Sequence, residues 1–286
     1  MSVDDIKSEM QEIYGINLST SAISIITNKV SQAATEWQNR PLDSLYMIVW
    51  MDGLVFKVRE NGKVINKTVY LCVGLNKEGL KEVLGMWIGK NESAAFWMGV
   101  LTDLKARGVE DILITVTDNL NGFTETIKSV FPASTTQICV VHKIRNSCRY
   151  VVWKEKKEFT ADLKNIYNAP TKEAAEMELD NFEQKWGAKY PYAIRSWRNN
   201  WEELTVFFDF PVEIRKIIYT TNLIENLNGK IRKYTKNKLS FPNDDALKKS
   251  VYLAINEIEK KWYQPIWNWA LIFNQFITIF ENRIQV

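Results

Sequence analysis

The spacing of hydrophobic residues along the chain changes near residue 40. Before that point apolar residues recur at helical intervals, which predicts two helices within residues 3–38, the first ending at Gly15 and the second capped at Ser19 or Thr20. Two short helices around a glycine-containing turn are typical of a helix-turn-helix fragment. They are equally typical of a hairpin used for packing or dimerisation, so both interpretations stay open.

From residue 45 onward the hydrophobic period falls to two, which is the period of a β-strand. Three strands joined as a meander are predicted first, with a turn at residues 60–63, and shorter strands and helices then alternate. The predicted strands cover residues 45–59, 67–75, 80–88, 112–116 and 135–139, and the predicted helices between them cover residues 92–107 and 122–130. In residues 141–212 the pattern indicates helices and no strand. This order favours the α/β class.

Composition narrows the class of protein further. With 46% hydrophobic and 25% charged residues, the 286-residue chain can bury a core, which excludes disordered and fibrous proteins. Three cysteines are too few for a disulfide framework and favour a reducing compartment. We find no signal-peptide pattern and no apolar run of the ~20 residues that a membrane span needs. We therefore expect a soluble cytoplasmic protein, with no membrane partner.

Two acidic residues follow hydrophobic strands. Asp52 comes after IVWM and Asp118 after LITVT, so each is predicted to close its strand. Strand ends are where α/β sheets place ligand sites, and neighbouring strands would set the two carboxylates side by side. Two such carboxylates resist joint ionisation, and a hard divalent cation such as Mg²⁺ or Mn²⁺ relieves this repulsion. The alternative is that both acids belong to ordinary turns.

A third acid, Glu225, lies far downstream in a predicted helix over residues 220–233. Thr221 or Asn222 is the predicted N-cap. Residues 213–238 carry seven basic residues against two acids, which is typical of a surface that binds a polyanion. Glu225 is therefore either a metal ligand that faces a bound phosphodiester or a salt-bridged residue on a solvated face.

Several long segments resemble one protein family. Two are similar to the C-terminal catalytic and closing segments of the bacterial Mutator-type insertion-sequence transposases, namely TTNLIENLNGKIRKYTKNKLSFPNDDALKKSVYLAI and WYQPIWNWALIFNQFITIFENR. Three more follow the same family in the same order: WMDGLVFKVRENGKV, ITVTDNLNGF and QICVVHKIRN. The resemblance implies an RNase H-like mixed-sheet core whose Asp-Asp-Glu triad, here Asp52, Asp118 and Glu225, binds two Mg²⁺ ions, with Mn²⁺ as a substitute.

The resemblance also implies a division of the chain and a function. The predicted parts are a helical N-terminal remnant at 1–38, the first part of the catalytic core at 39–140, an all-helical insertion at 141–212, and the second part of the core with the triad helix and C-terminal helices at 213–286. The implied function is metal-dependent cleavage and strand transfer of an insertion sequence. Its partners would be inverted-repeat ends and target DNA, bound by a homodimer at the bacterial nucleoid.

Two other functions stay open. The resemblance begins inside the family's N-terminal region, so we expect a shortened copy. Such a copy can be a non-catalytic, DNA-binding or dimerising protein that regulates full-length relatives. A stand-alone RNase H-like nuclease, which would cleave strands without joining them, is the third interpretation.

The only histidine, His142, follows Cys139 with the spacing C-x₂-H. A structural zinc site needs four ligands, and the chain offers too few, so zinc is not predicted. A hydrogen-bonded core histidine is the plain alternative. The family carries a Cys/Asp-x₂-His signature here, which implies that His142 lies near the active site. The residues expected to contact DNA are His142, Lys143, Arg145, Lys230, Arg232 and Lys233.

Aromatic residues give two further expectations. Trp186, Trp197 and Trp201 are expected in the core, with a base-stacking platform as the alternative. Trp153 lies within a second basic cluster. This cluster is suited to binding unpaired DNA or, alternatively, is the solvated charged face of an amphipathic helix. The stripe that contains Trp262, Trp267, Trp269, Phe273, Phe276 and Phe280 predicts a buried C-terminal helix.

Overall fold

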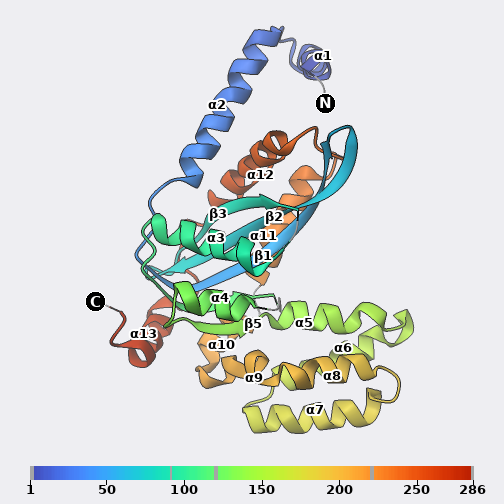
Figure 1. Ribbon diagram of the computed structural model, residues 1–286, viewed down its shortest axis with the longest axis vertical. Helices are drawn as coiled ribbons and strands as arrows, with labels where there is room; N and C mark the ends of the chain where they lie inside the picture. Colours follow the sequence, from blue (N-terminus) through green and yellow to red (C-terminus); the bar gives the residue numbers. More distant parts are fainter. Residues whose placement is uncertain (1–2, 91, 119–121, 220–221, 285–286) are drawn as a thin grey trace.

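A computed structural model describes residues 3–90, 92–118, 122–219 and 222–284. Its centre is a five-stranded mixed sheet with the order β3-β2-β1-β4-β5 (Figure 1). The strands are β1 (Leu45–Glu60), β2 (Lys63–Asn76), β3 (Lys81–Gly89), β4 (Asp111–Thr117) and β5 (Thr135–Ile138). β1, β2 and β3 form an antiparallel meander, whereas β4 and β5 run parallel to β1. The predicted α/β class with an RNase H-like mixed sheet is confirmed.

The longest pairing in the sheet is the β1–β2 hairpin. Its turn residues Asn61 and Gly62 have φ values of 50° and 77°. Positive φ at both central residues gives a turn whose twist matches that of the flanking strands, and asparagine followed by glycine adopts it readily. The predicted turn at residues 60–63 is therefore confirmed, and β1 remains paired with β2 along almost its whole length.

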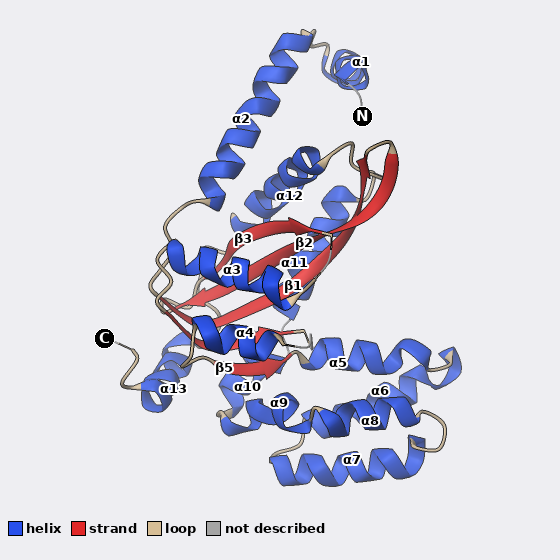
Figure 2. Cartoon of the chain, viewed as in Figure 1, coloured by secondary structure: helices blue, strands red, loops and turns tan. Residues whose placement is uncertain are grey.

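Helices cover both faces of the sheet (Figures 1 and 2). On one side lie α3 (Ala94–Ala106) and α4 (Phe123–Val130), and on the other lie α11 (Asn222–Thr235) and α12 (Asp244–Glu259). Side chains of β1 alternate between the two layers, as the strand period requires. Val49 and Met51 join the core under α3 and α4, while Trp50 and Leu54 join the core on the α11 side.

The two N-terminal helices extend away from the sheet (Figure 1). These are α1 (Val3–Tyr14) and α2 (Thr20–Gln38), as the sequence predicts. The α2 N-cap is Ser19, whose Oγ accepts a hydrogen bond from Ala22 N at 3.0 Å. Ile25 and Ile26 are more than half exposed on α2, and only its C-terminal half approaches α12 and β3.

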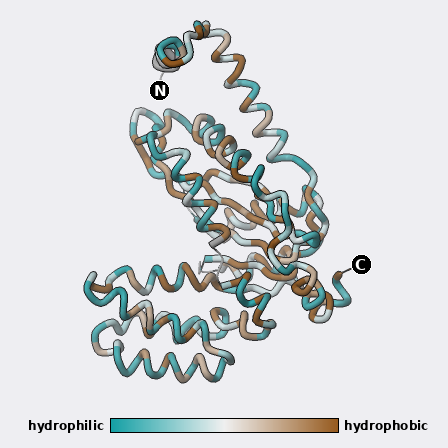
Figure 3. The backbone as a smooth tube through the Cα atoms, turned by 180° about the vertical axis from the view of Figure 1, so that it is seen from behind, coloured by the Kyte–Doolittle hydropathy of each residue, from teal (hydrophilic) through white to brown (hydrophobic). Residues whose placement is uncertain are grey.

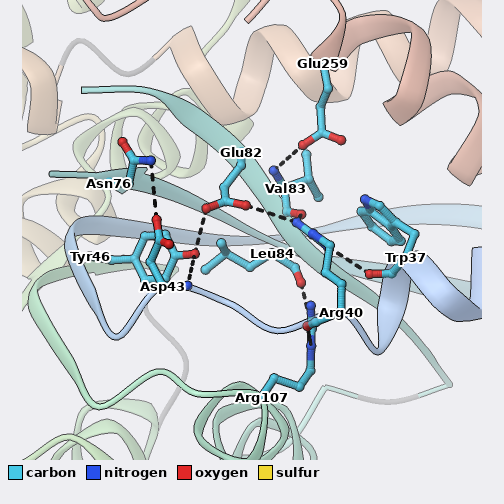
Figure 4. A network of polar contacts seen from close by, with 10 residues as sticks. All are labelled: Trp37, Arg40, Asp43, Tyr46, Asn76, Glu82, Val83, Leu84, Arg107 and Glu259. Carbon is cyan, nitrogen blue, oxygen red and sulfur yellow. Dashed lines mark hydrogen bonds and ion pairs between the residues drawn. The ribbon is translucent and has the colours of Figure 1, made fainter. Parts of the chain in front are cut away.

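A polar network joins the end of α2 to the edge strand β3 (Figure 4). Arg40 donates to Val83 O at 2.7 Å and to Glu82 Oε2 at 3.2 Å. The other Glu82 oxygen accepts from Tyr46 Oη at 2.7 Å, and Arg107 donates to Leu84 O at 2.7 Å. Because these side chains come from separate elements, the network fixes how α2, α3 and the sheet meet.

A block of helices follows the last strand and lies beyond β5 (Figure 1). Its α-helices are α5 (Val140–Ser147), α6 (Lys156–Tyr167), α7 (Lys172–Trp186), α8 (Pro191–Asn199), α9 (Trp201–Thr205) and α10 (Val212–Tyr219). Between residues 140 and 219 the described chain contains no strand, as predicted. The tube in Figure 3 changes between hydrophobic and hydrophilic along these helices, as amphipathic helices require.

The helical block and the sheet share one hydrophobic core. Trp186, Trp197 and Trp201 are each less than 10% exposed and belong to the same buried cluster as Trp50 of β1. Trp197 also donates from Nε1 to Ser147 Oγ at 2.9 Å. These tryptophans are core residues, as expected, so they offer no base-stacking platform. The domain boundaries predicted from the sequence stay a prediction.

The C-terminal aromatic stripe is buried only in part. α13 (Trp269–Phe280) begins later than the stripe, and within it Ile272 and Phe276 are the buried residues. Trp267 lies before the helix and is 89% exposed, so the prediction that the stripe forms a buried C-terminal helix is wrong for this residue. The physical reason is that residues 260–268 form turns and irregular segments, which place successive side chains in different directions. Among the described residues, no helix is long and apolar enough to span a bilayer.

Candidate active site

Asp52 and Asp118 meet at the end of the parallel part of the sheet. β1 and β4 pair in parallel as far as Trp50 opposite Val116, and Asp52 and Asp118 each follow two residues later. The two carboxylates are close enough for the charge of Asp118 to raise the pKa of Asp52. One expectation is wrong, because Asp52 does not close its strand. β1 continues to Glu60 with β2 as its partner, and only the parallel pairing with β4 ends at this point.

The Asp52 carboxylate is largely buried, since its side chain is 11% exposed. Oδ1 accepts from Gly53 N at 2.7 Å, and Oδ2 accepts from Asn228 Nδ2 at 2.5 Å. Burial raises the pKa of Asp52, and the charge of Asp118 raises it further, while His142 and the two hydrogen bonds lower it. Asp52 is therefore a desolvated acid beside a second acid, an arrangement that a cation stabilises.

The helix α11 brings Glu225 to the same place. Asn228 of α11 binds Asp52, and Glu225 precedes Asn228 by three residues, so both side chains project from one face of the helix. Glu225 Oε1 accepts from Arg145 Nη2 at 2.5 Å. The predicted N-cap at Thr221 lies outside the described residues, and α11 is described from the next residue onward. The three acids that the sequence singles out thus lie around one end of the sheet.

His142 stands next to Asp52. It lies in the first turn of α5, is 7% exposed, and its Nε2 is 3.6 Å from Asp52 Oδ1. Burial opposes its positive charge, but the Cys139 side chain and the carboxylates of Asp52 and Asp118 outweigh burial and raise the pKa of His142 to about 9. The neighbouring carboxylates thus favour the charged form of His142. His142 lies beside the acids, as the family signature implies, and its contact with DNA stays a prediction.

The other residues expected to bind DNA divide by exposure. Lys143 is 3% exposed and its Nζ donates to Asn200 Oδ1 at 2.5 Å, so we assign it no DNA contact. Burial lowers the pKa of Lys143 to about 8. Arg145 is 61% exposed, Lys230 is half-buried, and Arg232 and Lys233 lie at the surface of α11. The second basic cluster is also at the surface, with exposed Arg149, Trp153, Lys154 and Lys157.

Comparison with known proteins identifies the family. A family model described as Transposase, Mutator family, matches residues 1–265. The chain belongs to the Mutator family of transposases. A probable transposase for insertion sequence element ISRM3-like, from Sinorhizobium fredii, is 43% identical over 284 residues, which cover 99% of this chain and 71% of that protein. A probable insertion-sequence transposase from Corynebacterium diphtheriae is 40% identical, over 91% of this chain and 76% of its own length.

Solved structures give a weaker match to this Mutator-family chain. The Drosophila P element transposase in its strand transfer complex is 9% identical, covering 92% of this chain and 93% of its own, with a TM-score of 0.43. The Mos1 transposase in a paired-end complex with left transposon end is 12% identical over 70% of this chain and 68% of its own, with a TM-score of 0.19.

The two aspartates at this Mutator-family site are of a type that suits a hard divalent cation. Asp52 and Asp118 offer oxygen ligands, and the desolvation of Asp52 favours a positive partner. In the part of the chain that the structure describes, however, no three His, Cys, Asp or Glu side chains converge closely enough to hold a metal ion. Glu225 instead forms an ion pair with Arg145. The carboxylate that would complete the set is therefore engaged by a guanidinium.

Two residues at the site are not indicated by the sequence pattern. Asn228 binds Asp52, and its position three residues after Glu225 is the signal that would have indicated it. Glu92, before α3, is a fourth acid close enough for the charges of Asp118 and Asp52 to add to burial in raising its pKa. Glu92 also accepts from Trp97 Nε1 at 2.9 Å. It carries no strand-end signal, so only the fold reveals that it lies near the acids.

Proposed function

We propose that this chain is a DNA transposase whose acids Asp52, Asp118 and Glu225 act together in DNA cleavage and strand transfer. The observation that carries the proposal is the meeting of three elements. The first two acids follow the paired ends of β1 and β4 and interact through their charges, and the Asn228–Asp52 hydrogen bond attaches the helix of the third acid to β1. Membership of the Mutator family makes DNA the substrate that this arrangement fits.

The three acids would hold two divalent cations, with Asp52 shared because it lies between Asp118 and α11. When bound, such cations activate an attacking oxygen and stabilise the leaving oxygen of a phosphodiester displacement. The chain's own residues position this site. Gly53 N–H and Asn228 orient the two Asp52 oxygens, and the His142 imidazolium limits the repulsion among the acids.

The proposed reaction has two displacements. In the first, water attacks a phosphodiester at the end of the element, the bond from phosphorus to the 3′-oxygen breaks, and a 3′-hydroxyl is released. In the second, that hydroxyl attacks a phosphodiester of the target strand, forms a new bond to phosphorus and releases another 3′-hydroxyl. Exposed basic residues, among them Arg232 and Lys233 on α11, would bind the DNA backbone. Two ends must be joined in one event, so we expect two copies to act together.

The test is strand transfer from a pre-cleaved, 3′-hydroxyl end in Mg²⁺ or Mn²⁺. Pre-cleaved ends remove the first displacement from the assay and report the joining step alone. Asp52→Asn, Asp118→Asn and Glu225→Gln should each abolish joining, because each removes one charged oxygen ligand. Glu176→Gln, at an exposed acid on α7, is the matched control and should join strands as the unaltered protein does.

Each outcome has a distinct meaning. Joining that survives in all three acid variants would refute the assignment of the site. A folded chain that binds DNA and metal but joins no ends would favour the non-catalytic regulator. Cleavage of intact ends without joining would favour a stand-alone nuclease.

A further inference from the structure

A cavity of about 420 Å³ lies on the α11 side of the sheet. Its size is that of a small-molecule site, for which volumes of about 300–1,000 Å³ are usual. Trp50 and Leu75 of the sheet line it, together with one face of α11 and the segment before α13. Trp50 precedes Asp52 by two residues on the same face of β1, which corresponds to about 6.6 Å along a strand. The cavity and the acids are thus neighbours on one sheet face.

The helix α11 separates the cavity from the acids. With about 100° of rotation per residue, Leu223, Asn226 and Lys230 fall on one side of the helix, and Glu225 and Asn228 fall on the opposite side. The first three residues line the cavity, while Asn228 binds Asp52. The exposed ridge between these two sides carries Lys233. A flexible polyanion that crosses this ridge would therefore reach both sites.

The lining of the cavity combines aromatic rings with positive charge. Lys81 Nζ lies 5.7 Å from the centre of the Trp262 ring, and Trp267, 89% exposed, stands at the rim. Burial and the nearby charge of Lys230 both lower the pKa of Lys81, so the two ammonium groups repel each other. An anion between them would remove that repulsion. A flat ring against the tryptophans would cover apolar surface that is now exposed to water.

We propose that this cavity binds one unpaired nucleotide of a DNA strand, with the base against Trp262 and Trp267 and the phosphate at Lys81 and Lys230. Stacking tolerates any base, because every base has a π-face. The proposal rests on the function proposed above for the choice of DNA as the source of the nucleotide. A free nucleotide has the same chemistry, and the two sources are separated by experiment.

The test is titration calorimetry with dAMP, deoxyadenosine and a four-nucleotide single strand. We expect dAMP to bind at least about tenfold more tightly than deoxyadenosine, because the phosphate meets two lysines. Trp267→Ala should weaken dAMP and the tetranucleotide by about tenfold or more, since it removes a stacking ring. Because Trp267 is exposed, this variant should fold normally. Lys81→Ala should reduce the affinity for dAMP towards that for deoxyadenosine.

Matched controls are available on other surfaces. Tyr14→Ala removes an exposed aromatic residue of α1, and Lys128→Ala removes an exposed lysine of α4. Neither should change dAMP binding. Asp52→Asn separates this proposal from the proposed function, because strand transfer should be lost while dAMP binding persists.

Three results would overturn the proposal. The first is equal affinity for dAMP and deoxyadenosine, and the second is unchanged dAMP binding in Trp267→Ala. The third is that Trp267→Ala weakens the binding of dAMP but leaves the binding of the tetranucleotide unchanged. That result would identify a free nucleotide, and not a strand, as the occupant.

Discussion

Asn228 is predicted to hold the candidate site together, and its removal can be given a magnitude. Asn228→Ala deletes the 2.5 Å hydrogen bond to Asp52 and leaves a desolvated carboxylate with one donor fewer. Hydrogen bonds to charged groups contribute about 1.5–3 kcal/mol to the free energy of unfolding. Asn228 Oδ1 is buried and has no partner among the described residues, so its own desolvation offsets part of this gain. We therefore expect a loss near the lower limit, about 1.5 kcal/mol.

The measurement is urea unfolding followed by tryptophan fluorescence, with Asn226→Ala as the matched control. Asn226 is exposed on the same helix, so both variants gain the same helix propensity from alanine, and only Asn228→Ala loses a bond to Asp52. Strand transfer should also fall, because Glu225 shares the helix that this bond attaches to β1. If Asn228→Ala is as stable as Asn226→Ala and joins strands as well as the unaltered protein does, the reasoning that α11 is fixed through Asp52 is refuted.

Three further variants test other parts of the structure. Arg145→Ala frees Glu225 from an exposed ion pair that contributes at most about 1 kcal/mol, so the affinity for Mn²⁺, measured by calorimetry, should rise by up to about fivefold. Weaker Mn²⁺ binding in this variant would contradict a ligand role for Glu225. The pKa of Lys143 is lowered from 10.5 to about 8, so the unfolded chain binds more protons between these values and stability should rise with pH across that window. Lys143→Met should remove this rise in urea titrations at pH 8 and 10, and an identical pH dependence in both proteins would count against it. Trp197→Ala should lower the free energy of unfolding by about 3–5 kcal/mol in thermal or urea unfolding, because it leaves a cavity in the shared core. A much smaller loss would show that the helical block packs loosely.

Much of the fold was predictable because its signals are local. The β1–β2 turn depends on Asn61 and Gly62, and the α2 N-cap depends on Ser19. The pairing of Asp52 with Asp118 was predictable only on the condition that their strands are neighbours, which the strand order satisfies.

The remaining features depend on contacts between distant parts of the chain. Asp52 was expected at a strand end because it follows the hydrophobic run IVWM, but continuous pairing with β2 carries the strand on to Glu60. Lys143 looked like a surface cation, and only the packing of α5 against α8 buries it beside Asn200. Trp267 fitted a helical stripe, but the turns before α13 place it at the surface.

The shared core of the sheet and the helical block has a consequence for the order in which the protein is made. Asp52 and Asp118 leave the ribosome first, whereas Glu225 and Asn228 follow only after the whole block has been synthesised, and α11 needs the sheet face as its packing surface. During synthesis, therefore, the nascent chain carries two acids without the third. Under the proposed mechanism, a ribosome that stalls within residues 140–219 would release a fragment unable to cut DNA. The order of the elements along the chain would thereby delay DNA cleavage until synthesis is nearly complete.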